Sequence, residues 1–379
     1  MEVVISIASH FDAKTLGSFR LASRRCARAG TSLIPQNRLS VLNTAGSLRE
    51  LKQLLESPSI ANNTKDIMIV QGTWPICSCQ EWETHPLLCH GNDRSNPLLQ
   101  SGSADEAFAA YSDFIREQIA RRYHDDVNNL FNILRSLPNL HKVTISNIQM
   151  WAWHPTKNIH YHKLIKRIRM GPLLTYEVSP ALQILLLAFG TSFENIKNLN
   201  VVGDFNPTTL DVIPAASQFA NVQRLDIDAF RLLDNEDTIH RFLRAFPNIM
   251  ELFMRFQGWG PSIPTTVGQL FWRRPQFLRI EDLWASEDEI FHFFKNHSTT
   301  LICFNIYNAA LTQGSWRSLF TRIRSLGCQA SIVADGELYG RKSKYTLDMR
   351  HEDMSLKLEQ FMKDRNVQWP FEQISATQT

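Results

Sequence analysis

Three cysteines and two histidines gather between residues 77 and 90, where their side chains suggest metal chemistry. Cys77, Cys79 and Cys89 would supply thiolates, and His85 or His90 an imidazole, to a tetrahedral zinc ion. The C-x-C…C-H spacing differs from the paired C-x-x-C pattern of structural zinc sites, and the adjacent Cys89 and His90 are awkward joint ligands. We therefore interpret them as loop cysteines and expect no metal.

Carboxylates occur in two short runs, Glu281-Asp282 and Glu287-Asp288-Glu289. The second run begins a predicted helix, where negative charge is favourable against the helix dipole, and this accounts for it without catalysis. The sequence has no Gly-x-Ser-x-Gly elbow, no phosphate-binding loop, no His-Glu-x-x-His and no dinucleotide fingerprint. We expect a protein that is not an enzyme and needs no cofactor.

Residues 150–178 combine aromatic and basic side chains, a mixture that can bind nucleic acid. Leu164, Ile165 and Ile168 nevertheless define the buried side of a helix whose solvated side carries the lysines and arginines. The whole chain has 40 basic and 37 acidic residues, so it lacks the strong positive field of most nucleic-acid binders. We expect no nucleic-acid partner.

The chain has 379 residues and is 44% hydrophobic, enough for a large core. Its longest apolar run, Ile184–Phe189, is too short to cross a bilayer, so we expect no membrane partner. Six cysteines and the lack of a basic n-region at the N-terminus indicate a reducing compartment. We expect a cytoplasmic protein, a nuclear protein, or both.

A hydrophobic phrase, apolar-x-x-apolar-x-apolar, recurs through the second half. Its copies are Ile196–Val201, Val222–Ile227, Ile249–Met254 and Leu301–Ile306, with a shortened copy at Leu278–Ile280. The central residues Leu199, Leu225, Leu252, Leu278 and Phe304 follow one another at a nearly constant interval of about 26 residues. Each copy predicts a short strand, and the even period predicts an α/β solenoid of leucine-rich-repeat type with parallel strands and helical connectors.

The same pattern extends the array in both directions. Residues 67–70 and 143–145 predict earlier strands, and residues 330–334 a final one. We divide the chain into a helical module with its linker at 1–45, an irregular solenoid at 46–335, and a polar C-terminal tail with one helix at 336–379. Two surface insertions, at 71–104 and 150–178, interrupt the solenoid.

The N-terminal residues follow the order of a known sequence motif. Glu2, Phe11-Asp12, Lys14-Thr15-Leu16, Phe19-Arg20-Leu21 and Ser23-Arg24-Arg25 stand in an order similar to the F-box motif. With the repeats behind it, the chain resembles fungal-type F-box proteins that carry a degenerate leucine-rich-repeat-like C-terminal region. The resemblance implies a short all-helical module that docks on the adaptor Skp1.

The resemblance further implies the substrate-receptor subunit of a Skp1–cullin–F-box ubiquitin ligase, with a Skp1-like adaptor and a cullin complex as partners. The residues that would contact Skp1 are Val3, Val4, Ile7, Phe11, Leu16, Phe19, Ala22 and Arg24. An alternative is a repeat scaffold without a ligase role, in which a vestigial F-box caps the solenoid. Cys26, in place of a large aromatic residue, favours that alternative.

The solenoid strands predict a surface for an unknown protein substrate. Residues that alternate with the buried positions point to the opposite face of the sheet. Arginine and aromatic residues often anchor protein interfaces, and they are frequent on this face. The predicted substrate-binding residues are Arg224, Asp226, Phe253, Arg255, Arg279, Glu281 and Tyr307. The same alternation places Thr144 and Ser146 on this face.

Overall fold

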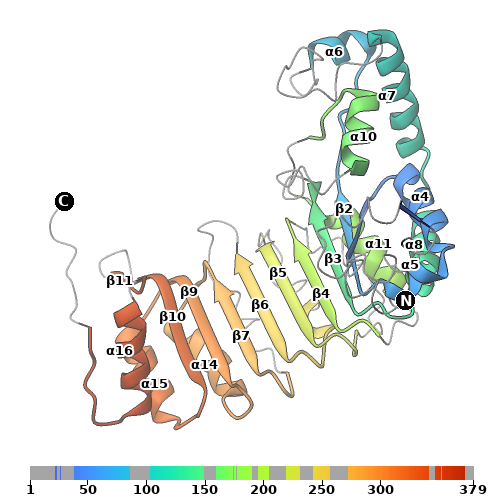
Figure 1. Cartoon of the computed structure of the whole chain (residues 1–379). Coiled ribbons are helices and arrows are strands. Elements are labelled where there is room, and N and C mark those ends of the chain that lie inside the picture. The colour runs from blue at the N-terminus through green and yellow to red at the C-terminus, as the bar shows by residue number, and fades with distance from the viewer. Residues whose placement is uncertain are drawn as a thin grey trace. The chain divides into compact units, whose positions relative to one another are not determined.

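The protein is mixed α/β, with largely parallel strands and helices between them (Figure 1). The computed structural model describes residues 22–23, 26, 38–85, 103–148, 159–173, 175, 177–189, 195–204, 219–230, 242–256, 272–340, 346–350 and 352–371. The chain divides into two compact units. Unit 1 comprises Met1–Tyr176 and Leu187–Ile196, and unit 2 comprises Glu177–Leu186 and Lys197–Thr379.

Unit 1 contains three parallel strands: β1 (Arg38–Leu42), β2 (Asp66–Gln71) and β3 (Lys142–Asn147). β2 lies between the other two, with Ile69 opposite Val41 on one side and Ile145 on the other. The strands predicted at 67–70 and 143–145 are therefore present. The earlier β1 lies at the end of the predicted helical module and linker at 1–45, and the sequence did not predict this strand.

Six described helices belong to unit 1. They are α4 (Ala45–Leu55), α5 (Pro58–Asn63), α6 (Cys79–Thr84), α7 (Ala104–Ile119), α8 (Tyr123–Arg135) and α10 (Ile159–Ile168). Thr44 caps α4 by accepting a hydrogen bond from the Ser47 amide. Ser103 and Glu106 form a capping box that begins α7.

The described parts of the two predicted insertions pack together in the interior of unit 1. Trp74 is 7% exposed, contacts Phe114 at 5.0 Å between ring centroids, and donates from Nε1 to the Met170 carbonyl at 3.2 Å. Trp82 is also buried, and Ile168 of α10 joins the same cluster. The predicted insertions therefore combine exposed residues, such as Ile76 and Lys163, with side chains that belong to the core of unit 1.

Unit 2 places its parallel strands side by side in chain order. They are β4 (Asn198–Val202), β5 (Arg224–Phe230), β6 (Glu251–Phe256), β7 (Phe277–Glu281), β9 (Cys303–Leu311) and β10 (Ser331–Tyr339); β8 (Trp284–Ala285) pairs with β9. The register aligns Leu199, Leu225, Leu252, Leu278, Phe304 and Ile332 in one buried row. The predicted period therefore corresponds to adjacent strands, and its last step, from Phe304 to Ile332, is slightly longer than the others.

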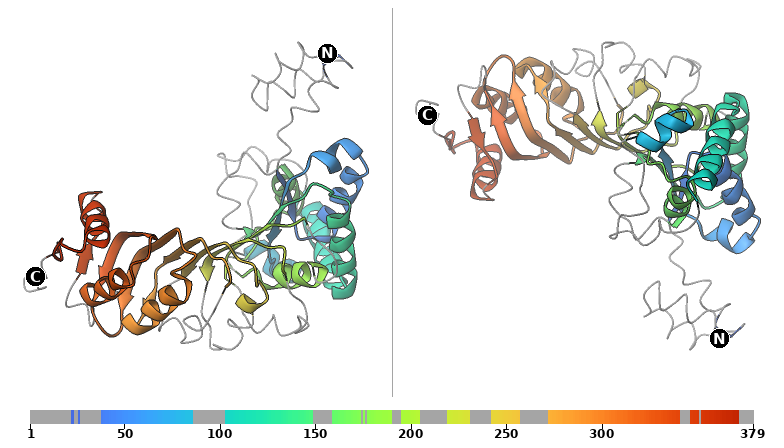
Figure 2. Two further views of the ribbon diagram at one scale, coloured as in Figure 1. Left: turned by 90° about the horizontal axis from the view of Figure 1, so that it is seen from below. Right: turned by 90° about the horizontal axis from the view of Figure 1, so that it is seen from above.

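Helices cover the side of the unit 2 strands to which this row points. α14 (Glu287–His297) and α15 (Trp316–Ser325) lie on the same side of β7, β9 and β10 (Figure 2). Phe294 of α14 contacts Phe304 of β9 at 5.4 Å, and both are fully buried. α11 (Ser179–Phe189) precedes β4 in the chain. On the opposite side, the side chains of β4 and β6 are half-buried, as their alternating burial shows.

Asparagine side chains play the same structural role at the turns before two of the strands. In each unit the side-chain amide donates to a carbonyl of the preceding repeat: Asn139 to Asn62 at 2.7 Å in unit 1, and Asn248 to Ala220 at 2.8 Å in unit 2. A hydrogen bond of this type satisfies a loop carbonyl and ties neighbouring repeats together. This contact explains why a Pro-Asn pair recurs before two of the strands.

The described residues of the predicted polar tail at 336–379 contain strands as well as the one helix that the sequence predicts. β10 continues to Tyr339 and pairs antiparallel with β11 (Thr346–Asp348). α16 (Glu352–Lys363) buries Phe361, against which Trp369 packs at 5.2 Å. The helix predicted here is present, and it covers the last strand of unit 2.

His297 gives unit 2 an acid-sensitive interior contact. It is 1% exposed, and Nε2 accepts from the Trp272 amide at 3.2 Å while Nδ1–H donates to the Phe293 carbonyl at 2.8 Å. Burial lowers the pKa of His297 below its usual 6.5, although the bond to Phe293 opposes the shift. The imidazole therefore stays neutral, because protonation would remove the acceptor for Trp272.

We expect the thermal stability of the protein to decrease as the pH falls below 6.5, because the unfolded chain then binds a proton that folded His297 does not. His297→Gln should flatten this dependence in melting curves recorded between pH 7.5 and pH 5. His292→Gln, on the exposed side of α14, is the control and should retain the loss. Equal pH profiles for His297→Gln and the unmodified protein would contradict this assignment.

Candidate functional site

The accessible side of the unit 2 strands carries a shallow hollow of about 420 Å³. It extends over β4, β5, β6 and β7. Six of the seven predicted substrate-binding residues line it: Arg224, Asp226, Phe253, Arg255, Arg279 and Glu281. Tyr307 is not in the lining, but it lies opposite Glu281 in the register of β7 and β9. The structure thus brings these residues together on one surface, which we call the open face.

Arg224 and Arg255 are each paired with carboxylates across the open face. Arg224 lies 3.2 Å from Asp226 on its own strand and 2.9 Å from Glu251 on β6. Arg255 of β6 pairs with Asp228 of β5. These pairs are half exposed, so each contributes little to stability, and their main effect is to hold the guanidinium groups in position.

The arginines extend further from the sheet than the carboxylates beneath them. Arg279 pairs with Glu281 on the same strand, and the two side chains are 45% and 15% exposed. Asp226 is likewise less exposed than Arg224, at 21% against 41%. A partner that approaches this face therefore meets guanidinium groups first and carboxylates below them.

Phe253 occupies the centre of the open face. It lies between Asp226 and Arg279 in the register of β5, β6 and β7. The Arg224 guanidinium carbon lies 4.4 Å from the centre of its ring, which is within the range of a cation–π contact. The aromatic ring thus already accommodates one cation.

Asp282 lies at the edge of this surface, directly after β7. Its backbone has a positive φ of 56°, and its side chain hydrogen-bonds Asn308. Burial, and to a smaller extent the neighbouring Glu281 and Asp228, raise the pKa of Asp282 above its usual value, while Asn308 and Arg255 oppose the shift. Asp282 is therefore harder to ionise than an exposed aspartate.

In unit 1, the corresponding side chains of β3 are buried. Thr144 is fully buried and Ser146 is 3% exposed, although the alternation of the sequence predicts both on an open face. Both faces of β3 are covered, so strand alternation alone did not reveal which strands stay accessible. The prediction for these two residues was wrong.

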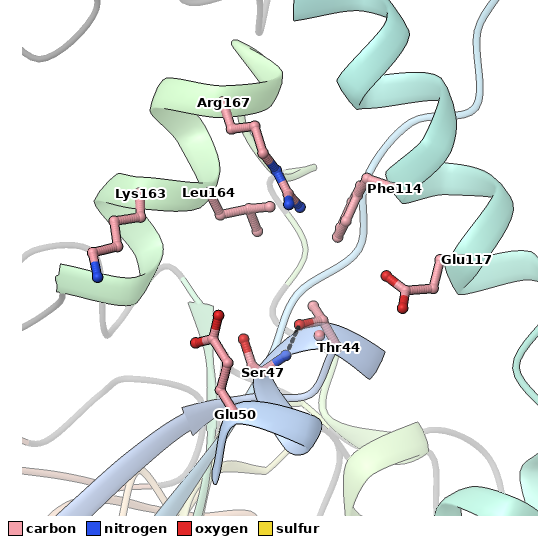
Figure 3. A pocket seen from close by; sticks show the side chains of 9 residues that line it. Thr44, Ser47, Glu50, Phe114, Glu117, Lys163, Leu164 and Arg167 are labelled. Atoms are coloured by element: carbon pink, nitrogen blue, oxygen red, sulfur yellow. Dashed lines mark hydrogen bonds between the residues drawn. The ribbon is translucent and has the colours of Figure 1, made fainter. Parts of the chain in front are cut away.

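A second hollow, of about 260 Å³, lies within unit 1 (Figure 3). Thr44, the N-cap of α4, lines it together with Gly46, Ser47 and Glu50 of that helix. α7 contributes Phe114 and Glu117, and α10 contributes Lys163, Leu164 and Arg167. The Arg167 side chain points toward Phe114, and Glu117 projects from the facing helix (Figure 3). Periodicity placed these residues on helices, but it had no signal that α10 packs beside α7.

The unit 1 hollow has a balanced charge. Lys163 and Arg167 contribute positive charge and Glu50 and Glu117 negative charge, and Glu117 also pairs with Arg49 at 2.6 Å. Nothing in the lining selects a particular ligand.

Two cysteines of the predicted zinc candidate, Cys77 and Cys79, lie within the described residues. The Cys77 thiol lies 3.1 Å from the Tyr111 hydroxyl, which itself donates to the Pro75 carbonyl, so the thiol proton points toward Tyr111. Cys79 is exposed at the start of α6. Within the described ranges, histidine, cysteine and acidic residues do not gather into a metal site. Cys89 lies outside those ranges.

The residues expected to contact Skp1 fall almost entirely outside the described part of the chain. Ala22 is the exception: it is helical and its side chain is exposed. The others are Val3, Val4, Ile7, Phe11, Leu16, Phe19 and Arg24. Nearby, the Cys26 amide donates to the Ser23 hydroxyl at 3.0 Å. The assignment of an adaptor-binding module therefore stays a prediction.

No protein-family model matches the chain, and no curated protein matches it. Among the helices that the structure describes, none is long and apolar enough to span a membrane.

Proposed function

We propose that this protein is the substrate-receptor subunit of a Skp1–cullin–F-box ubiquitin ligase. One combination carries the proposal: an N-terminal phrase similar to an F-box, from Glu2 to Arg25, precedes an array of parallel strands with an accessible polar face. The array supplies a surface on which a protein can be bound, and the phrase supplies the expected link to Skp1. Neither feature alone would favour a receptor.

The strand order supports a leucine-rich-repeat-like solenoid as the substrate-binding part. β4 to β7, β9 and β10 are neighbours in chain order, and their central residues recur at a nearly constant interval. In repeat architectures each unit buries its apolar face against its neighbours, which leaves an extended surface for partners. On this proposal the protein binds its substrate and a partnered conjugating enzyme transfers ubiquitin.

The first test is adaptor binding. The full-length chain should co-purify with Skp1 when the two are expressed together, and deletion of residues 1–28 should abolish that association. Phe253→Ala is the matched control, because it changes the open face and leaves the N-terminal phrase intact. Circular dichroism of each variant would show that the association was not lost through unfolding.

A folded full-length protein that does not bind Skp1 would overturn the ligase proposal. The same result would favour the second candidate function, a repeat scaffold in which the N-terminal phrase only caps the solenoid. Cys26 is the observation that favours this candidate, because it replaces a large aromatic residue of the motif. Loss of Skp1 binding by Phe253→Ala, in a folded variant, would also contradict the assignment of adaptor binding to residues 1–28.

A further inference from the structure

The hollow of the open face has no net charge in its lining, so the number of charges gives no preference for a partner of either sign. Its lining carboxylates are Asp226, Asp228 and Glu281, and its lining guanidinium groups are Arg224, Arg255 and Arg279. Each arginine is paired with a carboxylate of this set. An electrostatic preference must therefore come from the direction in which these ion pairs point.

The ion pairs point with their positive ends outward. The Oδ1 atoms of Asp226 and Asp228 are shielded from solvent. Glu281 is 15% exposed, whereas its partner Arg279 is 45% exposed. In all three pairs the guanidinium group is the more exposed member. Each pair is therefore a small dipole whose positive end faces an approaching molecule.

A dipole in this direction attracts an anion that comes into contact with it. A carboxylate of a partner would lie about 4 Å from the guanidinium carbon and about 8 Å from the carboxylate on the other side, so the attraction is about twice the repulsion. A cation that approached from the same side would meet the reverse. Because the two charges of each pair cancel at longer range, the preference acts only at direct contact.

Each guanidinium group also has N–H donors that its ion pair does not use. In the contacts among the described residues, Arg224 uses Nε and Nη1, which leaves Nη2. Arg279 uses Nε and Nη2, which leaves Nη1. Arg255 uses Nη2, which also leaves Nη1. A carboxylate can accept hydrogen bonds from such groups, and these charge-assisted bonds are about twice as strong as neutral ones.

Arg255 and Arg279 are better placed for this contact than Arg224, which is already paired with both Asp226 and Glu251. Arg279 of β7 lies directly opposite Phe253 of β6, and Arg255 follows Phe253 by two residues on the same face of that strand. The half-buried ring thus adjoins both arginines. It offers an apolar surface for the methylene groups of a glutamate side chain.

From the direction of the ion pairs and these remaining donors we infer that the open face binds an acidic segment of a protein partner, whose aspartate or glutamate side chains contact Arg255 and Arg279 beside Phe253. The inference rests on the proposed use of this face for substrate binding and specifies the chemistry of the substrate. An extended segment suits the hollow better than a small dicarboxylate does, because the hollow is shallow and crosses neighbouring strands about 4.8 Å apart.

The test uses the full-length protein and two rhodamine-labelled peptides of equal length, one with glutamate alternating with glycine and serine, the other with lysine in the acidic positions. Fluorescence anisotropy should show binding of the acidic peptide and much weaker binding of the basic one. The double variant Arg255→Gln/Arg279→Gln should bind the acidic peptide roughly tenfold more weakly.

Two matched variants separate a local site from an effect of total charge. Arg49→Gln/Arg116→Gln removes the same charge from two exposed, carboxylate-paired arginines of unit 1 and should leave the affinity within about twofold. Arg255→Lys/Arg279→Lys keeps the charge but lacks the second edge of the guanidinium group, so it should bind the acidic peptide about threefold more weakly.

A third variant should strengthen binding. Glu251 lies beside the hollow, outside its lining, and opposes an anion there while it holds Arg224. Glu251→Gln should therefore bind the acidic peptide about threefold more tightly, whereas Asp113→Asn, the same change of charge at an exposed position of unit 1, should leave the affinity unchanged. A variant that only damages the fold would not produce this gain, so the test remains informative even if the arginine variants unfold.

Equal or tighter binding of the basic peptide would overturn the inference. Unchanged affinity for the acidic peptide in a folded Arg255→Gln/Arg279→Gln variant would also overturn it, as would binding of a phosphoserine peptide without binding of the glutamate peptide. Skp1 co-purification is measured separately on the same proteins. Loss of peptide binding with retained Skp1 binding would reject the acidic partner alone, whereas the opposite result would reject the ligase role alone.

Discussion

Replacing Gly336 with alanine is expected to lower the free energy of unfolding of unit 2 by about 2–4 kcal/mol. Gly336 lies in β10 with φ at +72°, where an L-residue is strained. An added Cβ would lie 2.2 Å from the Asn308 Oδ1 atom. That oxygen accepts a hydrogen bond from the Glu337 amide at 3.0 Å, so it cannot move away without leaving the amide unsatisfied.

Gly327→Ala in the same unit is the matched control for Gly336→Ala. Gly327 also has a positive φ, +65°, but the nearest atom to an added Cβ is the end of the flexible Arg365 side chain at 3.5 Å. Its cost should be the backbone strain alone, about 1–2 kcal/mol. Urea denaturation followed by circular dichroism measures both variants, and equal losses would show that the contact with Asn308 is unimportant.

A second substitution at Asn308 should partly rescue Gly336→Ala. Asn308 has a positive φ of 47°, so glycine can replace it without backbone strain and removes the obstructing oxygen. The double variant Asn308→Gly/Gly336→Ala should therefore be destabilised by less than the sum of the two single variants. If the losses of unfolding free energy in the two single variants simply add in the double variant, the effect of Gly336→Ala comes from backbone strain alone.

Replacing Glu287 with alanine is the second large effect, with an expected loss of about 2–4 kcal/mol. Glu287 is 8% exposed at the start of α14, and its carboxylate accepts hydrogen bonds from the Ser315 amide at 3.0 Å and the Ser318 hydroxyl at 2.6 Å. Arg322 donates to it at 2.9 Å. Removing the carboxylate leaves the Ser315 amide and the Ser318 hydroxyl of the following repeat without their acceptor, and Arg322 keeps only its exposed partner Asp288.

Asp288→Ala is the control for Glu287→Ala, because Asp288 is paired with the same Arg322. Its carboxylate lies 2.7 Å from Arg322, but the Asp288 side chain is 71% exposed against 11% for Glu287. An exposed ion pair contributes at most about 1 kcal/mol. The two losses of unfolding free energy, measured by urea denaturation, therefore differ because the Glu287 carboxylate is buried and the Asp288 carboxylate is not. Similar losses would contradict the proposed role of Glu287.

The Glu287 contribution should depend on pH. Burial by itself raises its pKa, but the hydrogen bonds from Ser318, Arg322 and the Ser315 amide together lower the pKa below the usual 4.5. Because the folded pKa is the lower one, this stability is fully present above pH 4.5 and is lost as the pH falls through the folded value. Glu287→Gln should flatten the acid limb of a plot of unfolding free energy against pH.

The positions of β4, β5, β6, β7 and β9, and the composition of the open face, followed from the sequence. Alternating burial has a period of two residues, so Leu252 and Met254 point inward while Phe253 and Arg255 point outward wherever the strand is placed. The nearly even spacing of the repeated phrase then places successive strands side by side, and brings Asp226, Phe253 and Arg279 into one line. Both inferences depend on local pattern and simple repetition.

Tertiary structure decided which segments are interior and which side chains interact. Trp74 and Trp82 lie in a segment rich in glycine, proline and asparagine, and only their packing against α7 and near Met170 buries them. The sequence explained Glu287 by its place at a helix start, whereas its main partners come from the next repeat, 28 to 35 residues away. Such contacts join residues far apart in the chain. Neither hydrophobic periodicity nor local propensity predicts which distant segments will pack together.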